Sequence, residues 1–165
     1  MAQITLGGTP TQTSGDLPAI GSALANYQFT KHDMSPLSLS DLKGKRVVLN
    51  IFPSVDTGVC AASVRTFNQK ASALENTEVV CVSKDLPFAL ARFCGAEGIE
   101  NVQVTTDFRI PEFAQDNGLL IADGAFAGLD ARAIIVLNEM GSVTYTELVP
   151  EIGQEPNYDA AIAAL

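Results

Sequence analysis

Basic side chains are scarce in this chain of 165 residues. Ten Lys and Arg stand against 19 Asp and Glu, which gives a formal net charge of -9. Nucleic acids and anionic membrane surfaces are both bound through clustered positive charge. The shortage of positive charge therefore argues against either of them as a partner.

Long apolar runs are missing as well. No stretch approaches the roughly 18 consecutive apolar residues that a transmembrane helix needs. The first residues, MAQITLGGTPTQ, have neither the basic region nor the apolar region of a secretory signal peptide. We therefore expect a cytoplasmic protein, in a compartment where thiols stay reduced.

Metal ligands of the nitrogen and sulfur type are few. The chain has one histidine, His32, and three cysteines, Cys60, Cys81 and Cys94. There is no C-x-x-C motif and no pair of histidines, which argues against a zinc site. Three cysteines are also too few for a disulfide scaffold, so the role of cysteine here is more chemical than architectural. His32 lies at the polar end of a predicted strand, where a loop begins, and we expect it at the surface.

What the sequence does contain is an alternation of apolar runs with amphipathic segments. Ile4–Leu6 and Thr9–Gln12 flank Gly7-Gly8 and predict a β-hairpin, and Ser40 is the expected cap of a short helical turn that stops at Gly44. Further strands are predicted at residues 27–33, 46–52, 78–83, 102–106, 132–138 and 142–149, and helices at 60–74, 86–98, 110–118 and 158–165. This order predicts one α/β domain over residues 1–165, with a thioredoxin-like mixed sheet flanked by helices and an N-terminal hairpin extension.

Cys60 stands where a buried strand leads into an amphipathic helix. A thiol in the first helical turn lies near free backbone N–H groups and the positive end of the helix dipole, and both favour the reactive thiolate. Thr57, three residues earlier, can hold its hydroxyl beside the sulfur, and Pro53 can shield the sulfur from water. Gly58 lets the backbone approach a small ligand closely. The pattern indicates a nucleophile that attacks a small molecule containing oxygen.

The stretch PSVDTGVC fits the P-x-x-x-[TS]-x-x-C signature of peroxiredoxins. Together with LNIFPSVDTGVCAASVRTFN, DLPFALARFCGAEG and GLDARAIIVL, it resembles the bacterial thiol peroxidase subfamily, whose members are atypical two-cysteine peroxiredoxins. The resemblance covers nearly the whole chain.

The resemblance implies a role for each matching residue. Cys60 corresponds to the peroxidatic cysteine and Cys94 to the resolving cysteine, and the two would form an intramolecular disulfide. The remaining catalytic positions are Pro53, Thr57 and Arg132. Substrate would be bound by the side chains of Thr57 and Arg132 and by the backbone of Gly58 and Val59.

The resemblance also implies substrates and partners. Hydrogen peroxide and organic hydroperoxides, including those of lipids, would be reduced through a sulfenic acid on Cys60. Thioredoxin would then reduce the disulfide, and no metal or organic cofactor would be required. Members of the subfamily form homodimers, and we expect the interface beside the active-site loop.

Other interpretations apply to several of these residues. Cys81, inside an apolar strand, reads as a buried hydrophobic residue. Cys94 could pack with Leu90 on its helix, and Arg132 could form a structural ion pair. The chain could be a non-catalytic thioredoxin-like binding module. A dithiol oxidoreductase fits less well, because Thr57 stands where its first cysteine would be.

Overall fold

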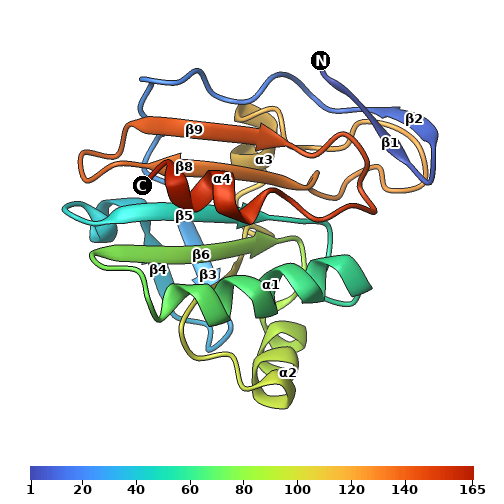
Figure 1. The fold of residues 1–165 in the computed structure, drawn as a ribbon. Coiled ribbons are helices and arrows are strands. Elements are labelled where there is room, and N and C mark those ends of the chain that lie inside the picture. Colours follow the sequence, from blue (N-terminus) through green and yellow to red (C-terminus); the bar gives the residue numbers. More distant parts are fainter.

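The computed structural model describes residues 1–165, and a mixed seven-stranded sheet forms its centre (Figure 1). The strands are β3 (Gln28–Lys31), β4 (Pro36–Ser38), β5 (Arg46–Ile51), β6 (Thr77–Ser83), β7 (Gln103–Thr106), β8 (Ala133–Leu137) and β9 (Val143–Leu148). They lie in the order β4-β3-β7-β6-β5-β8-β9. The pairs β5–β6 and β6–β7 are parallel, and the other pairs are antiparallel.

Helices cover both faces of this sheet. The first face carries α1 (Gly58–Ala71), α2 (Pro87–Glu97) and α4 (Tyr158–Ala163), which contribute to one hydrophobic cluster of 18 buried residues. The 3₁₀ helix η1 (Leu39–Leu42) and α3 (Glu112–Asp116) contribute to a second cluster, and α3 lies behind the sheet in Figure 1. The predicted thioredoxin-like α/β fold is confirmed.

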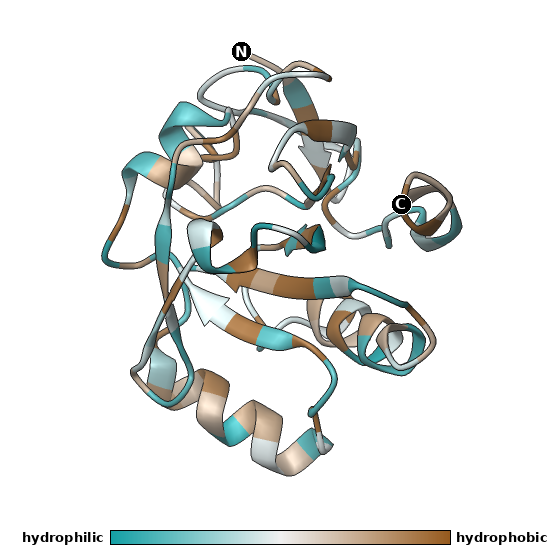
Figure 2. Ribbon diagram, turned by 90° about the vertical axis from the view of Figure 1, so that its left-hand side faces the viewer, coloured by the Kyte–Doolittle hydropathy of each residue, from teal (hydrophilic) through white to brown (hydrophobic).

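The central strands are apolar at successive positions because both of their faces are covered. Along β5, Val48 belongs to the first cluster and Leu49 to the second. Along β8, Ile134 and Ile135 divide in the same way. Figure 2 shows the middle of the sheet as mostly hydrophobic ribbon, with hydrophilic residues gathered in the loops. The continuous apolar runs that predicted these strands are thus explained by burial on two sides.

The predicted N-terminal hairpin is present as a separate two-stranded sheet of β1 (Gln3–Leu6) and β2 (Thr9–Gln12). Gly7 and Gly8, at φ 58° and 82°, form the turn, and two positive φ values in succession favour glycine. The hairpin is attached to the chain after β9: the amide of Thr5 donates to the carbonyl of Pro150, and that of Ile152 donates to the carbonyl of Thr5, each at 2.8 Å.

Two local features differ from the prediction. The short strand β4, which begins with Pro36, pairs with β3 at the edge of the sheet and had no strand signal of its own. The helical turn begins at Leu39, with Ser38 and not Ser40 as its cap, and the carboxylate of Asp41 accepts the Ser38 amide at 3.0 Å. An edge position tolerates a proline, whose missing N–H would break a ladder inside the sheet. None of the helices combines the length and the apolar character needed to cross a bilayer.

Glu151 fixes the hairpin to the segment that follows β9. Its carboxylate accepts the Thr5 hydroxyl at 2.5 Å and the amides of Gly7, Gly8 and Gly153 at 2.9, 3.1 and 3.1 Å. The Thr5 hydroxyl, followed by these amides, lowers the pKa of Glu151 to about 2. Because the folded pKa lies below the unfolded value, the carboxylate contributes stability above about pH 4.5, and this contribution is lost as the pH falls through 2.

We therefore predict that Glu151→Gln lowers the free energy of unfolding at pH 7. The difference from the wild type should shrink as the pH falls from 4.5 towards 2, because protonation removes the same negative charge. Urea unfolding followed by circular dichroism across this pH range measures the difference. The matched control is Glu139→Gln, at an exposed glutamate whose carboxylate makes no hydrogen bond. An equal, pH-independent effect of both substitutions would contradict the prediction.

Candidate active site

Cys60 is placed by the start of helix α1. Thr57 is the N-cap, with an extended φ of -101° and ψ of 144°, and the helix runs from Gly58. Cys60 is therefore in the first turn, as predicted, and its side chain is 0% exposed. The amides of Gly58, Val59 and Cys60 have no acceptor in the protein, as is usual for a helix start. A sulfur and a set of free N–H donors thus lie at the same end of the sheet.

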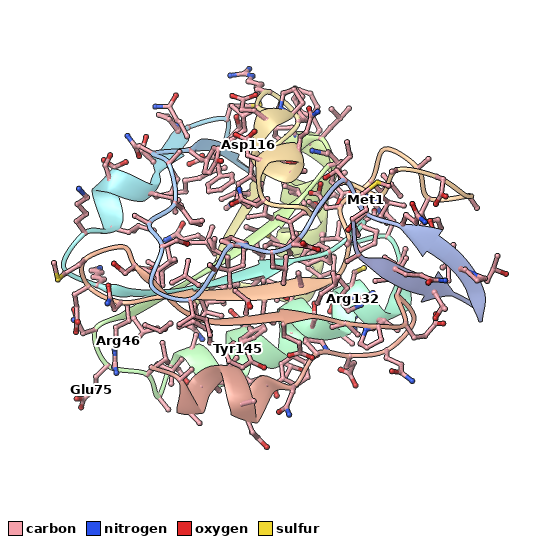
Figure 3. The ribbon with its side chains drawn as sticks, turned by 90° about the horizontal axis from the view of Figure 1, so that it is seen from above. Met1, Arg46, Glu75, Asp116, Arg132 and Tyr145 are labelled. Carbon is pink, nitrogen blue, oxygen red and sulfur yellow. The ribbon has the colours of Figure 1, made fainter.

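Arg132 is the cation that the fold brings to this sulfur. It stands just before β8, is 2% exposed, and places Nη2 at 3.2 Å from the Cys60 Sγ. Its Nε donates to the carbonyl of Ile152 at 2.8 Å, whereas Nη1 is buried and has no partner. Figure 3 labels Arg132 at the hairpin end of the molecule, away from Arg46 and Glu75.

The surroundings of Arg132 differ from those of a structural ion pair. No carboxylate oxygen lies within 4 Å of its guanidinium, and the sulfur and one carbonyl are its partners. A buried cation without a carboxylate partner is costly, and the Cys60 sulfur is the side-chain atom to which this guanidinium is bonded. The unpartnered Nη1 is a donor that remains available to a small ligand with oxygen acceptors.

The loop between β5 and α1 supplies the other predicted residues. Pro53 is buried directly after the strand, and the half-buried Thr57 donates its hydroxyl to the carbonyl of Ser54 at 3.0 Å. This bond uses the one hydroxyl proton of Thr57 and leaves its lone pairs free to accept a hydrogen bond from a ligand. Gly58 is exposed, and a Cβ added there would meet nothing within 4 Å, so packing alone does not demand glycine at this position.

A hollow of about 280 Å³ opens between this loop and helix α2. Thr57 and Gly58 line its inner side, and Arg92 and Phe93 of α2 line the opposite side. Two ion pairs span the hollow: Arg65 to Glu97 at 2.7 Å and Arg92 to Asp56 at 3.1 Å. Cys60 is not among the lining residues and is fully buried.

The other two cysteines are buried on the same face of the sheet. Cys60, Cys81 and Cys94 all belong to the hydrophobic cluster under α1 and α2, and all three thiols are free. Burial raises the pKa of Cys81 to about 12 and that of Cys94 to about 11. In this fold, therefore, neither thiol ionises readily at neutral pH.

His32 is less exposed than the sequence suggested. It is half-buried, its Nδ1 is enclosed without a hydrogen-bond partner, and its amide donates to the carbonyl of Val104 at 3.3 Å. Together with Cys94 it lines a second hollow, of about 330 Å³. His32 thus lines a hollow at the surface but is partly covered, because the chain after β3 continues along β7.

Comparisons with known proteins bear on this arrangement. Residues 14–162 match the model of the family described as Redoxin. The chain belongs to the redoxin family. It is 59% identical to a thiol peroxidase of Mycobacterium tuberculosis (strain ATCC 25618 / H37Rv) over 165 residues, covering 100% of this chain and 99% of that protein. It is 54% identical to a thiol peroxidase of Corynebacterium glutamicum over 165 residues, with the same coverage.

Solved structures agree with the family assignment. A peroxiredoxin-like protein from Aquifex aeolicus superimposes with a TM-score of 0.93 at 35% identity, covering 99% of this chain and 95% of that chain. A thiol peroxidase from Chromobacterium violaceum gives a TM-score of 0.88 at 20% identity, covering 96% and 91%, and this likeness supports the fold. The chain is accordingly an oxidoreductase of the thiol peroxidase type, and the predicted resemblance to this family is confirmed.

One buried cluster of charged residues in this redoxin chain was not predicted from the sequence. The Lys84 ammonium lies 2.5 Å from Asp107 and 3.2 Å from Asp130, and both aspartates are 0% exposed. Burial raises the pKa of each aspartate, although Lys84 opposes the shift. Burial alone would lower the pKa of Lys84, but the two carboxylates outweigh it and raise that pKa.

The position of this cluster indicates its structural role. Lys84 directly follows β6 and Asp107 directly follows β7, and the Lys84 ammonium also pairs with Asp130, two residues before Arg132. These ion pairs therefore hold in place the segment that carries the guanidinium. A charged residue directly after a buried strand, as at Lys84 and Asp107, was the available signal. The three residues are too far apart in the chain for the sequence to reveal their pairing.

We predict that Arg132→Met retains the fold but loses most of the peroxidase activity. The substitution removes the positive charge beside the sulfur and the free Nη1 donor together, and loss of one preorganised donor commonly costs about 10²- to 10³-fold in rate. The measurement is the second-order rate constant for hydrogen peroxide, with circular dichroism as the check on folding. Arg132→Lys, which keeps the charge but not the forked donors, should fall between the two. Wild-type rates in a folded Arg132→Met protein would make Arg132 purely structural.

Proposed function

We propose that this protein reduces hydrogen peroxide and organic hydroperoxides, with Cys60 as the peroxidatic thiolate. The observation that carries the proposal is the 3.2 Å contact between the Arg132 guanidinium and the Cys60 sulfur, beside a second guanidinium nitrogen that has no partner. A neighbouring cation stabilises a thiolate, and a free donor can hold a peroxide oxygen.

The first step is attack of the Cys60 thiolate on the terminal oxygen of the peroxide. A sulfur–oxygen bond forms and the oxygen–oxygen bond breaks, which leaves a sulfenic acid on Cys60 and an alkoxide or hydroxide. The leaving group takes a proton from water and departs as alcohol or water. Arg132 Nη1 is suited to donate to the peroxide oxygens, and the Thr57 hydroxyl oxygen, whose own proton is donated to the Ser54 carbonyl, is suited to accept a hydrogen bond from the peroxide O–H. Pro53 and the amides of Gly58 and Val59 complete the proposed pocket.

The second step is resolution by Cys94. Its sulfur attacks the sulfenic sulfur, an intramolecular Cys60–Cys94 disulfide forms as the sulfur–oxygen bond breaks, and the hydroxide that leaves combines with the proton lost by the Cys94 thiol to give water. In the folded state Cys94 is 7% exposed and burial raises its pKa to about 11, so it is a poor nucleophile there. We therefore propose that the first turn of α1 and the part of α2 around Cys94 unwind locally after oxidation, which exposes the thiol and lets the two sulfurs meet.

Thioredoxin is the proposed reductant of this disulfide, by thiol–disulfide exchange that returns both cysteines to thiols and leaves thioredoxin oxidised. Every proposed step takes place at a cysteine sulfur, so the proposal includes no metal or organic cofactor. We further propose a cytoplasmic location and one functional domain over residues 1–165.

The test of the second step is Cys94→Ser. This variant should still consume about one equivalent of peroxide, because Cys60 is intact, and then stop as a sulfenic acid that dimedone traps. Turnover coupled to thioredoxin should collapse, since thioredoxin attacks a disulfide. Cys81→Ala is the matched control, at a buried thiol of the same hydrophobic cluster, and should turn over normally. Undiminished turnover in Cys94→Ser, or a Cys60–Cys81 link in peptide maps of oxidised protein, would rule out the assignment.

We also propose a homodimer whose interface lies beside the active-site loop. Two exposed apolar side chains at the start of α2, Leu86 at 54% and Phe88 at 71%, support this choice, because a partner would remove them from water. Multi-angle light scattering at micromolar concentration should give twice the chain mass of 17.4 kDa. A particle of 17.4 kDa would contradict the dimer and leave the peroxidase proposal intact.

A further inference from the structure

Asp85 is a charged residue outside the proposed catalytic set that contacts the active-site loop directly. It lies between the end of β6 at Ser83 and the start of α2 at Pro87. Its half-buried carboxylate accepts three hydrogen bonds: from the Ser54 hydroxyl at 2.6 Å, the Val55 amide at 2.9 Å and the Ser83 hydroxyl at 2.7 Å. The two oxygens of a carboxylate have enough lone pairs to accept all three at once.

These bonds continue to Thr57. The Ser54 hydroxyl donates to Asp85 and accepts the Asp56 amide at 3.1 Å, so both its donor and acceptor directions are used. The Ser54 carbonyl in turn accepts the amide of Thr57 at 3.1 Å and its hydroxyl at 3.0 Å. The orientation of the Thr57 hydroxyl therefore depends on the position of Ser54, which Asp85 holds.

We propose that Asp85 is a positioning residue for peroxide reduction, acting through Ser54 on the Thr57 hydroxyl. This inference rests on the proposed function, because Thr57 has to receive the peroxide. The carboxylate fixes the loop that follows β5 to the loop that follows β6, so that the Thr57 oxygen is set before the substrate arrives. Preorganisation of this kind raises the rate because no loop ordering is left for the transition state.

The position of Asp85 predicts which step it controls. Its bonds reach the loop from Ser54 to Thr57, whereas Cys94 lies nine residues further along the chain, near the other end of α2. The unwinding proposed for the resolution step affects α1 from Gly58 onward and α2 around Cys94, and it involves neither Ser54 nor Val55, so the bonds between Asp85 and the loop can persist through it. Loss of Asp85 should slow sulfenic acid formation on Cys60 and leave the later resolution step largely unchanged.

The experiment uses Asp85→Ala and Asp85→Asn, each in the Cys94→Ser background, where the peroxide step is isolated. Rapid-quench mass spectrometry gives the second-order rate constant for sulfenic acid formation. A displacement of about 1 Å can cost on the order of 10²-fold, so we expect a loss of about ten- to a hundredfold in Asp85→Ala. Asp85→Asn should lose less, because its amide oxygen still accepts part of the network. In the Cys94-intact protein, the rate of disulfide formation after oxidation should change by less than about twofold, since the proposed contacts do not extend to Cys94.

The matched control is Asp123→Ala, also in the Cys94→Ser background. The Asp123 carboxylate likewise accepts a hydroxyl, from Thr11 at 2.6 Å, and a backbone amide, from Gln12 at 2.8 Å, but it serves the N-terminal hairpin. Its peroxide rate should equal that of the parent. Ser54→Ala should reproduce part of the Asp85→Ala loss, and the double variant should lose less than the product of the two, because both act through one network.

The outcomes distinguish failure of the proposed function from failure of the positioning role of Asp85. If the Cys94→Ser parent forms no sulfenic acid, the proposed function itself fails. If the parent reacts, and folded Asp85→Ala and Asp85→Asn react as fast as the parent, the positioning role is overturned while the proposed peroxidase function stands. Should Asp85→Ala fail to fold, Asp85→Asn and Ser54→Ala decide, and parental rates in both would overturn the role. An equal loss in Asp123→Ala would also overturn it, since the effect would then reflect general destabilisation.

Discussion

The buried contact between the Arg132 guanidinium and the Cys60 sulfur is the constraint that organises this structure. A cation enclosed without a carboxylate has to be held by other means. The hairpin pairs with the segment that offers the Ile152 carbonyl, and the cluster around Lys84 fixes the chain just before Arg132. The N-terminal hairpin lies at the edge of the molecule in Figure 1. It nevertheless supports the guanidinium indirectly, through the segment that contains Ile152.

The packing that suits the first chemical step, at Cys60, is unfavourable for the second step, at Cys94. A well-packed Cys94 is shielded from its partner, and burial keeps the pKa of its thiol at about 11. The fold that prepares Cys60 for peroxide is therefore unsuited to the second step, and the proposed cycle alternates between a packed and a locally unwound α2. Exposed ion pairs such as Arg92 with Asp56 contribute little to stability, so they would not prevent this opening.

Much of this could be predicted because the signals are local. Continuous apolar runs in β5, β6 and β8 predicted central strands, and the 3.6-residue spacing after Cys60 predicted α1. The short edge strand β4 was missed because three residues beginning with Pro36 carry no periodic pattern. Asp85 and the partners of Lys84 were missed because their meaning lies in long-range contacts, which the order of residues does not display. Arg132 was predicted through family resemblance, since an arginine before an apolar strand would otherwise suggest an ion pair.

The most direct test of the central claim compares two single-cysteine proteins under identical conditions. One keeps only Cys60, as Cys81→Ala with Cys94→Ser, and the other keeps only Cys94, as Cys60→Ser with Cys81→Ala. Each is mixed with a small excess of hydrogen peroxide at pH 7, and the loss of free thiol is followed in time. If the Arg132 contact prepares Cys60 for attack, the Cys60 protein loses its thiol faster by several orders of magnitude. Equal rates in the two folded proteins would contradict the account.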